Sequence, residues 1–387
     1  MPPLLAGGRR NEAFIDTLLG RGAMSRAFAR GVLAAWLATV AAVTPACAAA
    51  AAPSFTKLNA RVIDTYVLPR FRSLAATTGK LAADLDRACA GDRKAAAALS
   101  RDYADAVLSW AAVEFLRFGP MSVVGRPERF AFTPDPRGVT QRQVSGLIAK
   151  RDPAALDPAA LAKKSAAVQG LSALEVLLYD EANPIVGEGE AARYRCGLAR
   201  SMAQSTHTLA EEVLAEWQGS GGWRARMVDP RADDPLYKSS EEPAADFARA
   251  LITGLQMIQD RQVAPMIAGL SAPDRPVHLP YSRSGLAARY IGAGVSSTGA
   301  LYKAMGLGRK VPSEKAWMPR WIDAAFPRLA RDGPAAVEGL KRAKDNPERA
   351  RELRMVRFHI EGIRKLIGRE IAPMAGLTIG FNELDGD

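Results

Sequence analysis

The sequence predicts an all-α protein built from two helical-bundle domains, and three observations carry this prediction. Hydrophobic residues make up 48% of the 387 positions and aromatic residues only 7%. Alanine supplies much of the apolar fraction, which favours helices over an aromatic-rich sheet. Apolar residues recur at spacings of three and four in two successive sets of four or more segments, so we expect a pair of bundles.

Helical periodicity divides the chain into an N-terminal bundle over 54–218, a linker over 219–237 and a C-terminal bundle over 238–387. The linker opens with the glycine cluster Gly219-Ser-Gly-Gly222. No sequence repeat between the two sets is obvious, so any duplication is inferred from the number of helices. We expect helices over 55–90 with a kink at Pro69, 92–118, 141–150, 157–180, 190–218, 241–270, 285–305, 317–329, 334–343 and 347–371.

The N-terminus has the features of a secretory signal peptide. Starting from Met24, a basic segment precedes an apolar segment over 31–43, and Ala46-Cys47-Ala48 forms a cleavage motif. We therefore expect residues 1–48 to be removed on export. No later stretch approaches about eighteen uninterrupted apolar residues, so no spanning helix is expected. A lipoprotein anchored at Cys47 is the alternative, although the preceding residues match the usual leucine-containing motif poorly.

The formal net charge of +11 predicts a basic surface, but the distribution of the charges does not indicate a nucleic-acid partner. The Lys and Arg residues are dispersed, and no basic cluster is interleaved with aromatic residues. A solvated basic surface is therefore expected, and nucleic-acid binding is excluded.

Cys89 and Cys196 remain after processing, and we expect them to form a disulfide. An exported protein meets an oxidising compartment, and the two residues lie in different predicted helices. Closing a loop of about 100 residues stabilises a protein by roughly 4–5 kcal/mol in the chain-entropy model. The alternative is a pair of buried thiols.

The segment from Asp157 to Asp180 carries the candidate site. Asp157 is expected to cap a helix whose first turn contains Pro158. The apolar face of this helix includes two polar residues, Ser172 and Glu175. Gly170 weakens a helix by roughly 0.5–1 kcal/mol relative to alanine, which suggests the close approach of another backbone or of a ligand.

The motif Gly170-Leu-Ser172-Ala-Leu-Glu175 resembles the Gly-x-His-x-x-Glu signature of imelysin-like proteins, with Ser172 in place of histidine. These are bacterial periplasmic proteins associated with iron uptake and first described as peptidases. Arg117-Phe118-Gly119-Pro120 and the C-terminal segment 380–387 extend the resemblance over nearly the whole mature chain.

The resemblance implies a periplasmic protein that takes part in iron uptake by binding a metal, a metal complex or a partner protein between helices. The partner would be another periplasmic or outer-membrane iron-uptake protein. Iron or zinc is the implied metal, with Glu175 as a ligand. Serine is a weaker metal donor than imidazole, so direct coordination loses its best ligand. The implied ligand-binding residues are Gly170, Ser172, Glu175, Arg117, Asn382 and Asp385, where the helix meets the loop over 120–138 and the C-terminal segment.

Two other functions remain open, together with a purely structural interpretation of the acid. The first is a metallopeptidase of the imelysin type, which needs three protein ligands and an activated water. The second is a metal-free module that binds a small ligand through Arg117, Arg126 or Arg129. In the structural interpretation, Glu175 is a buried acid paired with Arg117 or Arg193.

The remaining candidates favour structural roles. The chain has no HExxH, GxSxG or P-loop motif. His207 and Glu211 are expected to form a surface pair, and Trp317 and Trp321 a core stripe. The segment 282–284 is expected to cap a helix, although such a helix start also suits an anion.

Overall fold

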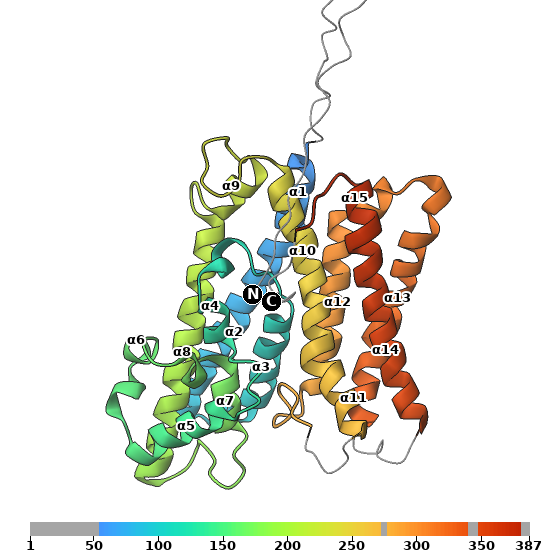
Figure 1. Cartoon of the computed structure of the whole chain (residues 1–387). Helices are drawn as coiled ribbons and strands as arrows, with labels where there is room; N and C mark the ends of the chain where they lie inside the picture. The colour runs from blue at the N-terminus through green and yellow to red at the C-terminus, as the bar shows by residue number, and fades with distance from the viewer. Residues whose placement is uncertain (1–53, 272–276, 340–346, 381–387) are drawn as a thin grey trace, which may run out of the picture. The chain divides into compact units, whose positions relative to one another are not determined.

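The computed structural model describes residues 54–271, 277–339 and 347–380, and all the regular secondary structure in these ranges is helical (Figure 1), which confirms the predicted all-α class. The predicted signal peptide over 1–48, with Cys47, lies outside the described residues. The predicted site residues Asn382 and Asp385 also lie outside them.

The N-terminal half is organised around α2, which lies beside α3 and α8, while α7 also packs on α8. The α-helices of this half are α1 Thr56–Val62, α2 Leu68–Cys89, α3 Arg93–Ala111, α4 Arg126–Phe130, α5 Val139–Lys150, α6 Pro158–Leu161, α7 Gly170–Leu178, α8 Gly189–Gln218 and α9 Trp223–Val228. The helix predicted over 92–118 ends at Ala111, and the chain continues from there in a run of turns.

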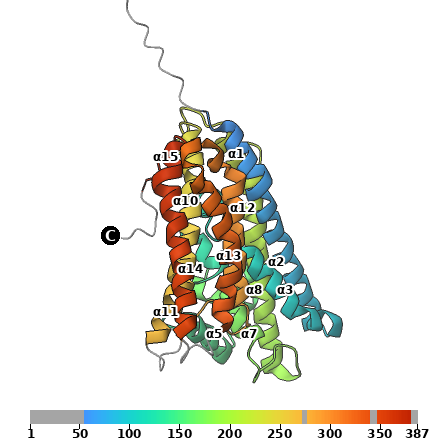
Figure 2. The same cartoon turned by 90° about the vertical axis from the view of Figure 1, so that its right-hand side faces the viewer.

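In the C-terminal half, α12 packs against α10, α13 and α3, and α13 packs against α14 (Figure 2). Its α-helices are α10 Glu241–Ile258, α11 Ala264–Ser271, α12 Ala287–Met305, α13 Trp317–Gly339, α14 Pro347–Lys365 and α15 Ala372–Met374. The two helices predicted over 317–329 and 334–343 are one helix, because α13 continues through Pro327 and Pro334.

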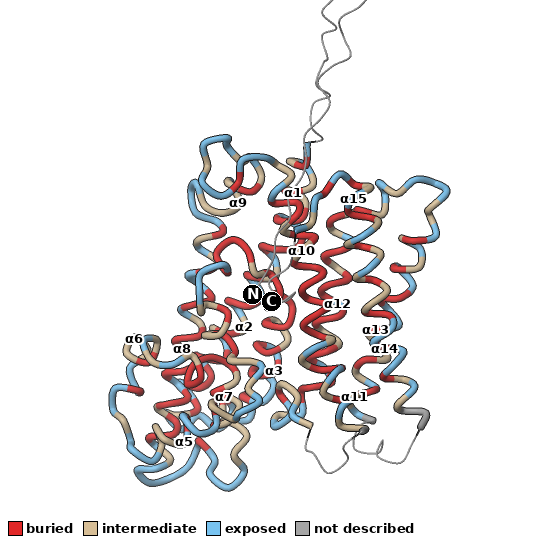
Figure 3. The backbone as a smooth tube through the Cα atoms, in the orientation of Figure 1, coloured by how far each residue is buried: buried red, intermediate tan, exposed pale blue. Residues whose placement is uncertain are grey.

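Helix α10 is central to the fold. From Pro243 onward nearly all of its residues are buried (Figure 3), so other parts of the protein cover it on nearly all sides. It packs against α12 and α14 and also contacts α1. Phe118, in the Arg-Phe-Gly-Pro motif, packs edge-on against Phe247 of α10, with ring centroids 5.3 Å apart. The motif therefore joins the two halves of the chain.

Three π-helical turns interrupt long helices, and each is followed by a proline. The turns are Ile63–Val67, Gln259–Val263 and Leu366–Ile371. Two positions after each turn stand Pro69, Pro265 and Pro373. The residue before each proline donates its N–H to the carbonyl five residues back. Since proline lacks an N–H and disrupts a regular α-helix, the wider turn accommodates it, including at Pro69, where we predicted a kink.

Two of these turns belong to a short sequence repeat that our sequence analysis did not recognise. The repeated segments are Arg261-Gln-Val-Ala-Pro-Met266 and Arg369-Glu-Ile-Ala-Pro-Met374. Each carries the end of a π turn and the following proline. The repeat was missed because it is only six residues long, which is much shorter than either of the predicted bundles.

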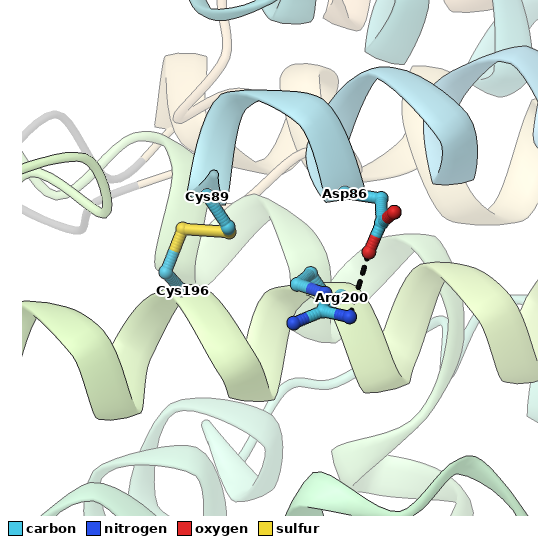
Figure 4. Close-up of a disulfide and its surroundings, with 4 residues drawn as sticks. All are labelled: Asp86, Cys89, Cys196 and Arg200. Atoms are coloured by element: carbon cyan, nitrogen blue, oxygen red, sulfur yellow. Dashed lines mark ion pairs between the residues drawn. A yellow bond between two sulfur atoms is a disulfide. The ribbon is translucent and has the colours of Figure 1, made fainter. Parts of the chain in front are cut away.

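The predicted disulfide between Cys89 and Cys196 is present. Cys89 is the last residue of α2, Cys196 lies in α8, and their Cα atoms are 5.7 Å apart (Figure 4). One turn away along each helix, Asp86 forms an ion pair with Arg200 at 2.6 Å. The disulfide therefore fixes the end of α2 to the first third of α8.

The segment over 219–237, predicted as a linker, is held to the helices around it. It contains α9, where Arg224 donates two hydrogen bonds of 2.7 Å to the carboxylate of Asp64. The side chain of Asn59 in α1 donates to the backbone carbonyl of Met227 at 3.0 Å. Residues 53–387 form one compact unit. The division into two domains at this segment stays a prediction.

Within this segment, Asp234 is expected to make a pH-dependent contribution to stability. Arg226 donates two hydrogen bonds of 2.8 Å to its carboxylate, and the N–H groups of Leu236 and Tyr237 donate to the same carboxylate. The Arg226 guanidinium holds the pKa of Asp234 well below its ordinary value of 3.8. A lowered pKa stabilises the fold above the unfolded-state value, and this stabilisation is lost as the pH falls through the folded-state value.

We therefore expect Asp234→Asn to lower the free energy of unfolding by about 1–3 kcal/mol at pH 7, and by less at pH 3, where the unfolded carboxyl is largely protonated. Urea denaturation at both pH values measures this. Asp233→Asn is the control, because the Asp233 side chain is 75% exposed and its ion pair with Arg231 is expected to contribute little. Equal losses for Asp234→Asn at the two pH values would contradict the prediction.

Candidate functional site

The candidate site is built on α7, which is shorter than the helix predicted over 157–180. The prediction of one continuous helix is wrong, because the segment consists of α6, a 3₁₀ turn over Ala166–Val168, and α7. Ser165 caps the 3₁₀ turn, and its side chain accepts the N–H of Ala167. Gly170 has φ +71°, which a continuous α-helix does not contain. The predicted cap at Asp157 is confirmed, since its carboxylate accepts the N–H of Ala160 at 2.9 Å.

Gly170 lies directly against the end of α4. A Cβ atom at this position would lie 2.2 Å from the backbone oxygen of Phe130 and 2.4 Å from that of Arg129. The predicted close approach of another backbone is therefore confirmed. This contact places the start of α7 beside α4 and directs the next residues of α7 toward the loop that follows α4.

Ser172 and Glu175 both line a pocket with a volume of about 530 Å³. One wall comes from α7 and from the loop after α4. This loop is part of the segment 120–138, which we predicted to adjoin the site. The other wall comes from the π turn before α11, from α11 and from the segment before α12. The polar and charged lining residues are Thr133, Asp135, Thr140, Gln141, Ser172, Glu175, Asp260, Arg261, His278, Tyr281, Ser282 and Arg283. Prolines and small apolar residues form much of the remaining lining.

The partner of Glu175 is Ser284 rather than the arginines proposed from the sequence. Its Oε1 accepts the N–H of Ser284 at 2.9 Å and the hydroxyl of Ser284 at 2.6 Å. Burial raises the pKa of Glu175, and the hydrogen bonds from Ser284 partly oppose this rise. The prediction that the segment 282–284 caps a helix is wrong, because α12 begins at Ala287 with Leu286 as its N-cap. Ser284 binds the carboxyl group of Glu175 instead.

The arginines proposed as ligand-binding residues do not line this pocket. Arg117 donates to the backbone oxygen of Glu114 at 2.7 Å and to Glu128 at 3.2 Å, and it lines a separate cavity of about 210 Å³. Arg126 forms two hydrogen bonds with Glu216, and Arg129 donates to the side chain of Gln169. The structure therefore brings Gly170, Ser172 and Glu175 together, but not these three arginines.

Sequence reasoning missed two residues that line the pocket, Arg261 and Tyr281. Arg261 lies in the π turn before α11, and its Nη1 is 3.6 Å from Glu114. Tyr281 is 2% exposed and has φ +59°. The short repeat that begins at Arg261 is a signal for the first residue. Nothing in the sequence around Tyr281 indicates its unusual backbone.

The described residues contain no group of three or more His, Cys, Asp or Glu side chains placed to hold a metal ion. In the pocket, Ser172 supplies only a hydroxyl where the family signature has an imidazole. Beyond the pocket, His207 lies against Gly79, and His359 stacks on Trp321. The side chains of the described ranges do not fit a bare transition-metal ion, which takes three or four protein ligands. Nor does any helix in those ranges have the length and apolar character needed to cross a membrane.

Comparison with known proteins identifies similar folds. The family model described as Imelysin (Peptidase_M75) matches residues 67–354. A solved imelysin-like protein from Psychrobacter arcticum 273-4 is 20% identical, with a TM-score of 0.61 over 84% of this chain and 98% of that chain. An iron-regulated protein A precursor from Parabacteroides distasonis ATCC 8503 is 11% identical, with a TM-score of 0.58 over 82% of this chain and 95% of that chain. At these identities the likeness shows the fold alone. No curated protein matches the chain.

Proposed function

Because the chain belongs to the imelysin family, we propose that it takes part in bacterial iron uptake by binding an iron complex in the pocket lined by Ser172 and Glu175. One observation carries this proposal. The two side chains at the signature positions of the family line the same cavity, and one of them is a partly buried carboxyl group whose pKa burial raises. The name of the Parabacteroides protein, which describes it as iron-regulated, supports the link to iron.

The size and composition of the pocket favour a complex over a bare ion. Its volume of about 530 Å³ lies within the range of roughly 300–1,000 Å³ that is usual for small-molecule sites. Apolar walls with a few polar groups are also typical of such sites. A complex brings its own ligands to the metal, so the protein needs to recognise only the outer surface of the complex. Direct coordination of iron or zinc by Glu175 stays a separate prediction.

We place this function in the periplasm, on the evidence of the signal-peptide features before residue 49. A protein there would receive the complex from, or pass it to, another periplasmic or outer-membrane protein of iron uptake. The second candidate is a metal-free module for a small polar ligand, which the hydroxyl of Ser172 in place of imidazole favours. The metallopeptidase hypothesis lacks a three-ligand metal group among the described residues.

The test is metal content and binding for the mature protein, residues 49–387. Elemental analysis of the protein as purified comes first. Calorimetric titrations at pH 7.5 follow with Fe(II), Fe(III) and Zn(II), and with two Fe(III) chelates, those of citrate and of acetohydroxamate. We expect Glu175→Gln to weaken binding of an Fe(III) chelate by at least about tenfold, because it removes the carboxylate that faces the metal-bearing part of the chelate while keeping the shape of the pocket wall.

Glu211→Gln is the matched control, since Glu211 is an exposed acid on α8 that does not line the pocket. It is expected to bind as the wild type does. The proposal is overturned if the wild type binds no iron compound, or if it binds one and Glu175→Gln leaves the affinity unchanged. Cleavage of a peptide that is lost in Glu175→Gln would favour the peptidase instead.

A further inference from the structure

We infer that this pocket binds a carboxylate group of the ligand through Arg261, Tyr281 and Ser172. The inference rests on the proposed function, and it defines the iron complex as one whose chelator carries carboxylates.

Four of the side chains that line the pocket have a buried polar atom without a hydrogen-bond partner, namely Thr140, Ser172, Arg261 and Tyr281. The proposed site uses three of these atoms, which are Nη1 of Arg261 and the hydroxyls of Tyr281 and Ser172. Arg261 Nη1 lies 3.6 Å from Glu114, which is too far for a hydrogen bond. Buried polar groups are nearly always hydrogen-bonded, and leaving one without a partner is costly. Several such groups around one pocket, contributed by both of its walls, indicate a missing partner.

Nη1 of Arg261 is only a donor, and both hydroxyls are able to donate, so an acceptor would satisfy all three groups. Burial, together with the nearby carboxylates of Glu114 and Glu175, raises the pKa of Tyr281 well above its ordinary value. The phenol therefore keeps its proton and is able to donate. A planar carboxylate, with two oxygens, accepts bonds from a guanidinium and from hydroxyl groups at the same time.

The unusual backbone conformation of Tyr281 indicates that the surrounding structure holds this residue in place. A bulky residue with φ near +60° is rare, and such conformations persist where the surrounding structure holds them, often at binding sites. The ring of Tyr281 packs against Tyr290, with centroids 4.6 Å apart. The strained backbone and this ring contact together hold the hydroxyl in the pocket wall.

The charges around Arg261 favour a single carboxylate group over a doubly charged phosphate group at this position. Arg261 lies beside Glu114, so the pair is close to neutral before a ligand binds. Glu175 carries a second negative charge, which Arg283 partly offsets. A phosphate with two charges would meet more repulsion than a single carboxylate. The polar part of the ligand that faces Glu175 is then a hydroxyl or the metal-bearing part of the chelate.

The test compares two probes on the mature protein: ferric citrate and the neutral Fe(III) complex of acetohydroxamate. We expect ferric citrate to bind more tightly than the acetohydroxamate complex. Tyr281→Phe removes only the hydroxyl, and we expect it to weaken ferric citrate binding by about tenfold or more. Its effect on the acetohydroxamate complex is expected to be less than twofold. Ser172→Ala is expected to act in the same direction.

Tyr302→Phe is the matched control. Tyr302 is also buried with a hydroxyl that lacks a hydrogen-bond partner, but it lies outside the pocket. Circular dichroism and thermal unfolding check that each variant is folded. Equal ferric citrate affinity in the wild type, Tyr281→Phe and Tyr302→Phe overturns the inference. Tighter binding of the acetohydroxamate complex overturns it while leaving the proposed function intact, and failure of every iron compound to bind overturns both.

Discussion

Replacing both cysteines of the disulfide with alanine is expected to lower the free energy of unfolding by about 4–5 kcal/mol. Cys89 and Cys196 are 107 residues apart in the sequence. A cross-link over this distance removes many conformations from the unfolded chain, and the chain-entropy model gives about 4.7 kcal/mol for a loop of 100 residues. Guanidinium denaturation of Cys89→Ala/Cys196→Ala beside the wild type, without reductant, measures the difference.

The control for this double variant is Asp86→Ala. It breaks the ion pair with Arg200 next to the disulfide but leaves the covalent link. Both side chains of the pair are about half exposed, so the expected loss is below about 1 kcal/mol. If the double variant loses no more than Asp86→Ala, the cross-link contributes little beyond local contacts between α2 and α8.

The second large effect is expected for Gly170→Ala, which should destabilise the protein by about 3 kcal/mol or more and abolish ligand binding. Alanine at φ +71° is strained. Its Cβ would also lie 2.2 Å from the backbone oxygen of Phe130, which is unable to move aside as a flexible side chain would. The start of α7 has to shift, and Ser172 and Glu175 shift with it. Urea denaturation and Fe(III) chelate titration measure the two consequences.

Gly146→Ala separates this effect from the general effect of adding a methyl group to a helix. Gly146 lies inside α5, and a Cβ there meets nothing within 4 Å. Alanine is a better helix former, so this variant is expected to gain roughly 0.5–1 kcal/mol. A similar gain for Gly170→Ala would show that neither the backbone angle nor the contact with α4 matters.

The features predicted correctly from the sequence depend on local chemistry. The all-α class follows from the alanine content and the spacing of apolar residues. The cap at Asp157 follows from an acid before a proline, because both properties act within one helical turn. The disulfide followed from the expected export, since only one pair of cysteines remained to be joined. The position of Gly170 against another backbone was also predicted, because glycine in a helix carries an entropic cost that needs a reason.

The features that were not predicted depend on contacts between distant parts of the chain. Glu175 and its partner Ser284 are separated by 109 residues, and periodicity within one helix carries no information about such a pair. The break before α7 was missed because the alanine-rich segment has helical spacing throughout. Only the backbone angle of Gly170 and the cap at Ser165 reveal it. The second wall of the pocket, with Arg261 and Tyr281, was missed for the same reason as Ser284.

The π turn at Gln259–Val263 has a consequence for how this pocket evolves. A π turn contains one residue more than the α-helical turn in its place. Each residue of an α-helix corresponds to a rotation of about 100°, so loss of a single codon here would turn Arg261 to another face of the helix. The bundle would persist, because α10 and α11 would still pack through apolar side chains. A one-residue deletion in this turn would therefore change the chemistry of the pocket while leaving the fold in place.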